Sequence, residues 1–139
     1  MNTRKFFLGG IAGGIIYFLL GYLIYGILLR DYMKPLVDGV DRGGNEIFWS
    51  LIVGNLLLGF LISYVLNRSG VASVSDGLTT GTVTGLLFSS GYDLIMYGTT
   101  NLASLSQVAA DIAAFTVISA IAGAVIAMVA RPVTRVATA

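Results

Sequence analysis

The sequence contains 139 residues, of which 56% are hydrophobic and 11% are charged, and its mean hydropathy is +0.88. Soluble domains carry about 25% charged residues, so this composition indicates an integral membrane protein. The formal net charge is +1, with 8 Lys and Arg against 7 Asp and Glu, which excludes the basic surface that a nucleic acid partner would need.

The first of four hydrophobic runs begins close to the N-terminus, after Arg4 and Lys5. A bilayer core is about 30 Å thick and needs about 20 helical residues, a length that all four runs reach. They are residues 6–29, 47–66, 77–97 and 108–130. The first run is about twice as long as the apolar part of a secretory signal and lacks an A-x-A cleavage site, so we interpret it as a retained span. The pattern predicts an all-α fold, a four-transmembrane-helix bundle in a single domain over residues 1–139.

The positive charges are divided unequally between the two sides of such a bundle. The side with both termini carries Arg4, Lys5, Arg68, Arg131 and Arg135, and the other side carries Arg30, Lys34 and Arg42. Because cytoplasmic segments are enriched in Lys and Arg, the distribution predicts a multi-pass protein of the bacterial inner membrane with both termini in the cytoplasm.

Residues 31–41, between the first and second runs, predict a short amphipathic helical segment on the outer membrane surface. Its apolar members at helical spacing are Met33, Leu36, Val37 and Val40. Trp49 follows at the membrane interface. The alternative is an irregular loop, because Pro35 and Gly39 both disfavour a helix.

Capping residues mark the expected starts of the third and fourth helices. Ser73 and Asp76 have the spacing of a capping box, and so do Ser104 and Gln107. A carboxylate in the first turn is also favoured by the helix dipole. We therefore interpret Asp76 as a capping residue and not as part of a site.

Small residues recur at every fourth position in the hydrophobic runs, and such ridges let helices approach closely in lipid. The predicted helix-packing glycines are Gly10 and Gly14 in the first run, Gly59 in the second, and Gly77, Gly81 and Gly85 in the third. Packing within one chain is the favoured interpretation, and packing between two copies is the alternative.

An internal resemblance links GIIYFLLGYLIYG, residues 14–26, to GLLFSSGYDLIMYG, residues 85–98. Both stretches contain a Gly, two apolar residues and an aromatic, then Gly-Tyr, then Tyr-Gly. Both would cross the membrane in the same direction, so the resemblance predicts a duplicated helical hairpin arranged as a parallel repeat. The alternative is chance similarity between two glycine-rich helices.

Asp93 and Asp111 are acidic residues inside the third and fourth runs. With a rise of about 1.5 Å per residue and only the short loop GTTNLASLS between the helices, the two residues fall at nearly the same depth in the outer half of the membrane. An aspartate at the bilayer centre costs roughly 2.5–3.5 kcal/mol, so such residues face the bundle interior, find partners and mark functional paths. We expect the two carboxyl groups to meet and to share a proton or bind a cation.

Other polar side chains lie in the same outer half of the predicted spans. They are Tyr22, Tyr25, Asn55, Tyr92 and Tyr97. We take Asn55, Tyr92 and Tyr22, together with Asp93 and Asp111, as the candidates for proton or cation binding. As alternatives, the aspartates hold helices together through contacts worth about 0.6 kcal/mol each, Asp111 satisfies the dipole of its helix, and the tyrosines form an interfacial belt.

The chain contains no cysteine and no histidine, which excludes disulfides, thiol chemistry and the usual zinc and haem ligands. A metal ion would have to be held by oxygen atoms, and we expect neither a metal nor a cofactor. No nucleophile, metal motif or phosphate loop accompanies the two aspartates, so we do not expect an enzyme.

Tyr92-Asp93-Leu94 and Asp111-Ile112-Ala113, preceded by Gly85-Leu86, resemble motifs of a family of small four-span bacterial membrane proteins known only as a domain of unknown function. The resemblance covers roughly the last half of the chain. This sequence has Ala114-Phe115 where the family has Trp-Gly, and it has no acidic residue in the first span. The resemblance implies the four-span fold and the placement of the aspartates, and it implies no activity.

Two functions follow from these features. The first is proton- or cation-coupled transport or permeation through the intramembrane aspartate pair, for which a hydrated cavity should reach the carboxylates. The second is a non-catalytic accessory or assembly subunit that packs through its glycine faces against a larger membrane protein complex, for which the core should be sealed. The expected partners are the lipid bilayer and a second copy or a larger complex.

Overall fold

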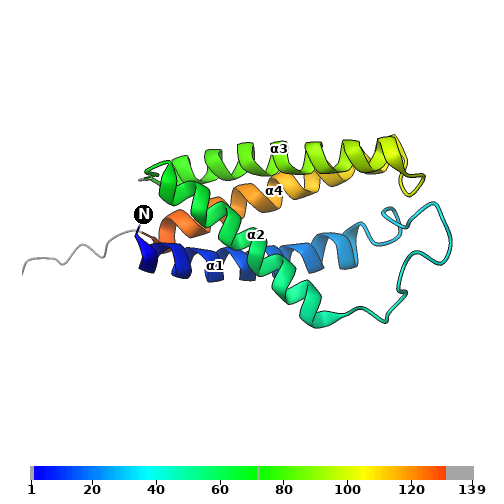
Figure 1. The fold of residues 1–139 in the computed structure, drawn as a ribbon, viewed down its shortest axis with the longest axis horizontal. Helices are drawn as coiled ribbons and strands as arrows, with labels where there is room; N and C mark the ends of the chain where they lie inside the picture. The colour runs from blue at the N-terminus through cyan, green and yellow to red at the C-terminus, as the bar shows by residue number, and fades with distance from the viewer. Residues whose placement is uncertain (1, 72, 131–139) are drawn as a thin grey trace, which may run out of the picture.

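The computed structural model describes residues 2–71 and 73–130. The elements are α1 (Thr3–Gly21), the π-helix η1 (Tyr22–Leu28), α2 (Phe48–Arg68), α3 (Val74–Thr99) and α4 (Leu105–Val129). Because η1 continues α1 directly, the chain forms four long helical rods (Figure 1). No strand occurs in these described ranges, and the predicted all-helical class is confirmed.

Three of the rods are long and apolar enough to cross a membrane. They are Thr3–Leu28, which joins α1 and η1, Phe48–Arg68, which is α2, and Leu105–Val129, which is α4. This result supports the membrane class that the composition predicts. α3 does not reach the same apolarity, because Gly, Ser and Thr are frequent in its sequence.

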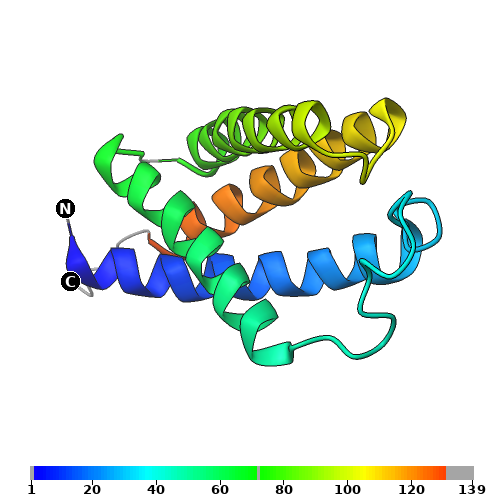
Figure 2. The same cartoon turned by 45° about the vertical axis from the view of Figure 1, so that its right-hand side comes forward.

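The helices pack as two neighbouring pairs. α3 lies along α4 and α1 packs against α2, while α1 also contacts α4; α2 and α3 touch only slightly. Figures 1 and 2 show α2 crossing α1 obliquely, with α3 and α4 side by side above them. The pairs are both antiparallel, and α1 runs in the same direction as α3 (Figure 1). The first helices of the two pairs differ in detail, because the rod that begins with α1 ends in the π-helix η1, whereas α3 remains α-helical to Thr99.

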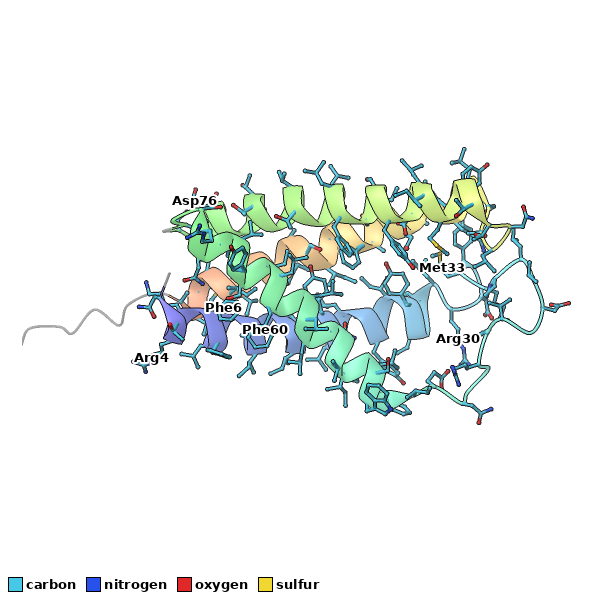
Figure 3. The ribbon with its side chains drawn as sticks, in the orientation of Figure 1. Arg4, Phe6, Arg30, Met33, Phe60 and Asp76 are labelled. Atoms are coloured by element: carbon cyan, nitrogen blue, oxygen red, sulfur yellow. The ribbon has the colours of Figure 1, made fainter. Side chains whose placement is uncertain are left out.

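The two ends of the molecule carry different parts of the chain. The start of α1, the link from α2 to α3 and the end of α4 lie at one end, which we call the terminal end (Figure 1). Residues 29–47 and the turn between α3 and α4 lie at the opposite end, which we call the loop end. Figure 3 shows Arg4 and Asp76 at the terminal end and Arg30 and Met33 at the loop end.

Glycines allow α3 and α4 to approach at backbone distance. A Cβ atom added at Gly77 would lie 2.6 Å from the carbonyl oxygen of Gly123, and one at Gly81 would meet the carbonyl oxygen of Ser119. A Cβ at Gly85 would meet the Ser119 side chain. All three α3 glycines are buried, so this ridge packs within the chain.

α1 and α2 cross in the same way. A Cβ at Gly59 would collide with backbone atoms of Gly10 and Gly14, and one at Gly14 would lie 2.8 Å from the Cα of Leu56. A Cβ at Gly10 would fall on the ring of Phe60. Since hydrophobic burial does not drive helices together in lipid, this close backbone contact is what lets the helices associate.

Buried hydroxyl groups link the helices of the core. The Tyr17 hydroxyl of α1 and the Ser119 Oγ of α4 are 2.6 Å apart, and Ser119 Oγ also donates to the Phe115 carbonyl at 2.7 Å. Ser63 Oγ of α2 donates to the Phe6 carbonyl of α1 at 2.8 Å. These three hydroxyl groups are thus paired, as an apolar environment requires.

The segment 31–41 forms turns and irregular backbone in place of the predicted amphipathic helix. Pro35 lacks an N–H for a helical hydrogen bond, and Gly39 has φ of +79°, which only glycine adopts easily. Lys34 Nζ lies 2.7 Å from Asp31, and the Lys34 hydrogen bond and charge hold the pKa of Asp31 below its usual value. The alternative of an irregular loop therefore describes this segment.

Long-range hydrogen bonds fix this loop against the second helix pair. The Leu36 N–H donates to the Leu102 carbonyl at 2.9 Å. Gln107 Nε2 donates to the carbonyls of Tyr32 and Lys34 at 2.8 and 2.9 Å. These bonds use backbone groups that an amphipathic helix would have needed internally.

The predicted caps are present at both helix starts. Ser73 Oγ accepts from the Asp76 N–H at 3.0 Å, and Asp76 lies in the first turn of α3. Ser104 and Gln107 form a reciprocal capping box at the start of α4, because the Ser104 N–H donates to Gln107 Oε1 at 2.7 Å and the Gln107 N–H donates to Ser104 Oγ at 3.3 Å. α3 and α4 consequently begin directly after Ser73 and Ser104.

Candidate functional site

Asp93 of α3 and Asp111 of α4 face each other across the contact between these helices. Asp93 is only 8% exposed, and both aspartates line the same small cavity. The structure therefore brings the two aspartates together at one level, as their positions in the sequence predict.

The Asp93 carboxyl group is not fully satisfied. Its Oδ2 is the one buried side-chain oxygen or nitrogen in the described ranges that has no hydrogen-bond partner. Two ionised carboxylates offer only acceptors to each other, so they cannot form a hydrogen bond without a proton between them. The geometry thus accommodates one shared proton or one cation.

Tyr25 of η1 extends this pair to a third helix. Its hydroxyl group donates to Asp111 Oδ1 and lies 3.5 Å from the Asp111 carbonyl oxygen. Tyr25, Asp111 and Asp93 form a row from η1 through α4 to α3, which we call the carboxylate cluster.

The π-helical winding of η1 affects the direction of the Tyr25 side chain. The Leu29 N–H donates to the carbonyl of Ile24, five residues earlier, at 2.7 Å. A turn closed by an i→i+5 bond holds one residue more than an α-turn, which rotates the side chains of residues 22–28 relative to those of α1. Such π-segments are rare and are frequently found at functional sites.

A cavity of about 150 Å³ reaches both carboxyl groups at the loop end. Its lining includes Met33, Tyr92, Asp93, Gln107 and Asp111. Since a water molecule occupies about 30 Å³ of liquid volume, the cavity has room for a few waters beside the pair.

A second cavity of about 630 Å³ lies between α1, η1, α2 and α4, and Tyr25 forms part of its wall. The Tyr25 hydroxyl group is bonded to Asp111, which lines the smaller cavity. One hydrogen bond therefore joins the walls of the two cavities.

Three polar residues predicted to join the aspartates have different positions. Tyr92 lines the smaller cavity and is 59% exposed. Asn55 and Tyr22 line the larger cavity and not the smaller one, and Asn55 Nδ2 donates to the Leu51 carbonyl of its own helix at 2.7 Å. The structure does not bring Asn55 or Tyr22 to the carboxylates, because Asn55 lies on α2, which pairs with α1 and touches α3 only slightly, and Tyr22 on η1 is exposed.

Two residues of the site were not among the sequence candidates, Tyr25 and Gln107. Tyr25 lies at the correct level, but the sequence does not distinguish it from Tyr22. Gln107 was interpreted only as a capping residue, although it is four residues before Asp111 and so shares one face of α4 with it. That spacing is a sequence feature by which Gln107 could have been found.

Comparisons with protein-family models, with curated proteins and with solved structures found no match. The resemblance of residues 85–86, 92–94 and 111–113 to a family of small four-span proteins stays a prediction. The geometry of the carboxylate cluster is the basis for assigning a function.

Replacing Tyr25 by Phe tests whether the hydroxyl group stabilises the cluster. The change keeps the ring and removes a donor to a charged acceptor, so we expect the free energy of unfolding to fall by about 1.5–3 kcal/mol. Tyr22→Phe is the control, because Tyr22 is 65% exposed on the same π-helix and should change stability by less than about 0.5 kcal/mol. Reversible unfolding in mild detergent measures both, and equal losses would contradict the assigned bond.

Proposed function

We propose that α3 crosses the membrane together with the three more apolar rods. It has 26 residues, about 39 Å at about 1.5 Å per residue, which exceeds the roughly 30 Å of a bilayer core. Three of its threonines bond to its own backbone: Thr79, Thr82 and Thr99 donate to carbonyls four residues earlier at 2.8–3.0 Å. Polar groups satisfied within the helix are tolerated in lipid, and α3 lies along α4, which is apolar enough to span.

We propose a bacterial inner-membrane location with the terminal end in the cytoplasm. The described cations divide equally between Arg4, Lys5 and Arg68 at the terminal end and Arg30, Lys34 and Arg42 in the loop. Arg131 and Arg135 lie outside the described residues, and the prediction counts them with this side because they follow the fourth hydrophobic run in the sequence. The positive-inside rule then favours this orientation.

The function that the geometry supports best is proton- or cation-coupled transport or permeation. The observation that carries it is the Asp93–Asp111 pair, in which Asp93 is buried, its Oδ2 lacks a partner, and a cavity extends to the pair from the loop end. Intramembrane acidic pairs of this kind mark ion and proton paths. The described residues contain no group of three or more His, Cys, Asp or Glu side chains that could hold a metal ion, and we take a proton or a monovalent cation as the ligand of the pair.

The residues of the cluster have distinct roles in this proposal. One carboxyl group, when protonated, donates to the other, and a bound monovalent cation would instead lie between their oxygens. Tyr25 holds Asp111 in position from η1. The smaller cavity supplies the route by which water and ions reach the pair from the loop end.

Reconstitution into liposomes tests the proposal. We expect gradients of H⁺, Na⁺ or K⁺ to drive flux of at least one of these ions through the wild-type protein. Asp93→Asn and Asp111→Asn should each reduce that flux by about tenfold or more, a loss of about 1.4 kcal/mol, because neither variant can exchange a proton or balance a cation at the substituted position.

Asp76→Asn is the matched control for this experiment. Asp76 belongs to the same helix as Asp93 but is an exposed capping residue at the terminal end, so its flux should equal that of the wild type. Transport of all three ions that is unchanged in both site variants would refute the proposal.

The exposed side of α3 favours a second function, that of an accessory subunit of a larger membrane complex. A Cβ at Gly91 or Gly98 would meet no heavy atom within 4 Å, so these small residues form an unused face suited to close approach by another helix. Gentle purification from the native membrane distinguishes the two functions. An accessory subunit should elute with a partner in fixed stoichiometry and should conduct no ion alone.

A further inference from the structure

The larger cavity has the position and length of a lipid chain in one leaflet. Its lining extends from Tyr17 to Gly26 on the first rod and from Phe48 to Leu58 on α2, and Arg30, Gly44 and Glu46 line it from the loop. Residues 17 to 26 span about 14 Å at about 1.5 Å per residue, and one leaflet of the bilayer core is about 15 Å thick. The cavity therefore runs from the membrane surface at the loop end to about the middle of the bilayer.

The deep part of this cavity is apolar and aromatic. Tyr17, Phe18, Leu58, Phe115 and Ile118 line it, and the Tyr17 hydroxyl group is already bonded to Ser119. The volume of about 630 Å³ falls within the roughly 300–1,000 Å³ of ligand-binding sites. Such a wall suits a hydrocarbon chain and offers no free charge to a polar ligand.

The mouth of the cavity carries one charge of each sign. Arg30 and Glu46 both line it, and Figure 3 shows Arg30 at the loop end. The one ion pair among the described residues joins Lys34 to Asp31. Neither Arg30 nor Glu46 is therefore part of an ion pair within that part of the chain. Glu46 Oε1 accepts only from the Gly44 N–H, at 3.2 Å.

We propose that this cavity binds one phospholipid of the loop-end leaflet whose head group carries both a phosphate and a primary ammonium group. Arg30 holds the phosphate, which a guanidinium group recognises well, and Glu46 holds the ammonium group. One acyl chain lies along the aromatic wall. A head group with a phosphate alone would leave Glu46 unpaired beside an anion, and a purely cationic ligand would face Arg30.

This inference stands apart from the transport proposal, because it rests on the larger cavity and not on the carboxylates. Its readout is bound lipid and not ion flux, so the two can fail separately. The experiment equilibrates the detergent-purified protein with equal amounts of phosphatidylethanolamine and phosphatidylglycerol and counts retained lipids by native mass spectrometry. We expect one phosphatidylethanolamine per wild-type chain and about tenfold less phosphatidylglycerol.

Gly21→Leu blocks the cavity in a controlled way. Gly21 lines it, and a Cβ there has a single neighbour within 4 Å, Asn55 Oδ1 at 3.8 Å, so the new side chain enters the space without displacing backbone. We expect retained lipid to fall about tenfold. Gly54→Leu is the control, because a Cβ at Gly54 meets nothing within 4 Å and Gly54 does not line the cavity; it should retain lipid like the wild type.

The mouth residues are tested by Glu46→Gln, which should remove most of the preference between the two lipids, and by Arg30→Gln, which should lower the retention of both because both carry the phosphate that Arg30 holds. The proposal is overturned if Gly21→Leu keeps as much lipid as Gly54→Leu, or if the wild-type protein retains phosphatidylglycerol as well as phosphatidylethanolamine. The wild-type comparison alone decides the head-group assignment if a variant does not fold.

Discussion

Gly81→Ala is expected to lower the free energy of unfolding by about 3 kcal/mol or more, the upper range for overpacking a core. The added Cβ would collide with the Ser119 carbonyl oxygen and lie 3.1 Å from the Gly123 Cα. Both are backbone atoms of α4, so no side chain can rotate away. α3 and α4 must move apart, which weakens the most extensive helix contact in the molecule.

Gly91→Ala is the matched control, with the same substitution in the same helix. A Cβ at Gly91 has no heavy atom within 4 Å, and alanine is a better helix former than glycine by up to about 1 kcal/mol. We therefore expect Gly91→Ala to leave stability unchanged or to raise it slightly. Circular dichroism during reversible unfolding in detergent measures both variants. Similar losses in the two would mean that α3 does not pack on α4 through Gly81.

The helices could be predicted from the sequence because their causes are local. Hydrophobic length identifies α1, α2 and α4 as membrane-spanning candidates, and the Ser73 and Ser104 caps fix where α3 and α4 begin. Residues 31–41 could not be predicted in this way. Their backbone groups bond to Leu102 and Gln107, far away in sequence, and no local pattern encodes those partners.

The candidate site was predictable in depth but not in direction around the helices. Rise per residue and a short connecting loop are enough to place Asp93 and Asp111 at one level. Choosing between Tyr22 and Tyr25 also requires the rotation of the first rod, and the π-helical turn of η1 changes that rotation. Tyr25 consequently reaches Asp111, and Tyr22 is exposed.

The structural and functional interpretations of the aspartates predict opposite effects on stability. If Asp93 serves to hold α3 and α4 together, Asp93→Asn should be neutral or should lose about 0.6 kcal/mol, the average for polar contacts between membrane helices. If the pair is a binding centre, it keeps two acceptors face to face at the expense of stability. Function and stability would then conflict at this position, as they often do at sites.

Asp93→Asn is therefore expected to raise the free energy of unfolding by about 1–3 kcal/mol, the penalty of an unsatisfied buried polar group, in the same variant that loses ion flux. The Asn amide can donate to Asp111, which gives the partnerless Oδ2 position a hydrogen bond and removes one of two like charges. Asp76→Asn, at an exposed cap, should show no such gain. Unfolding in detergent at neutral pH measures the difference. A stability loss in Asp93→Asn would assign the pair to helix packing. A stability gain would support a binding centre, because a carboxylate that an amide would improve is retained only where a proton or cation must be exchanged.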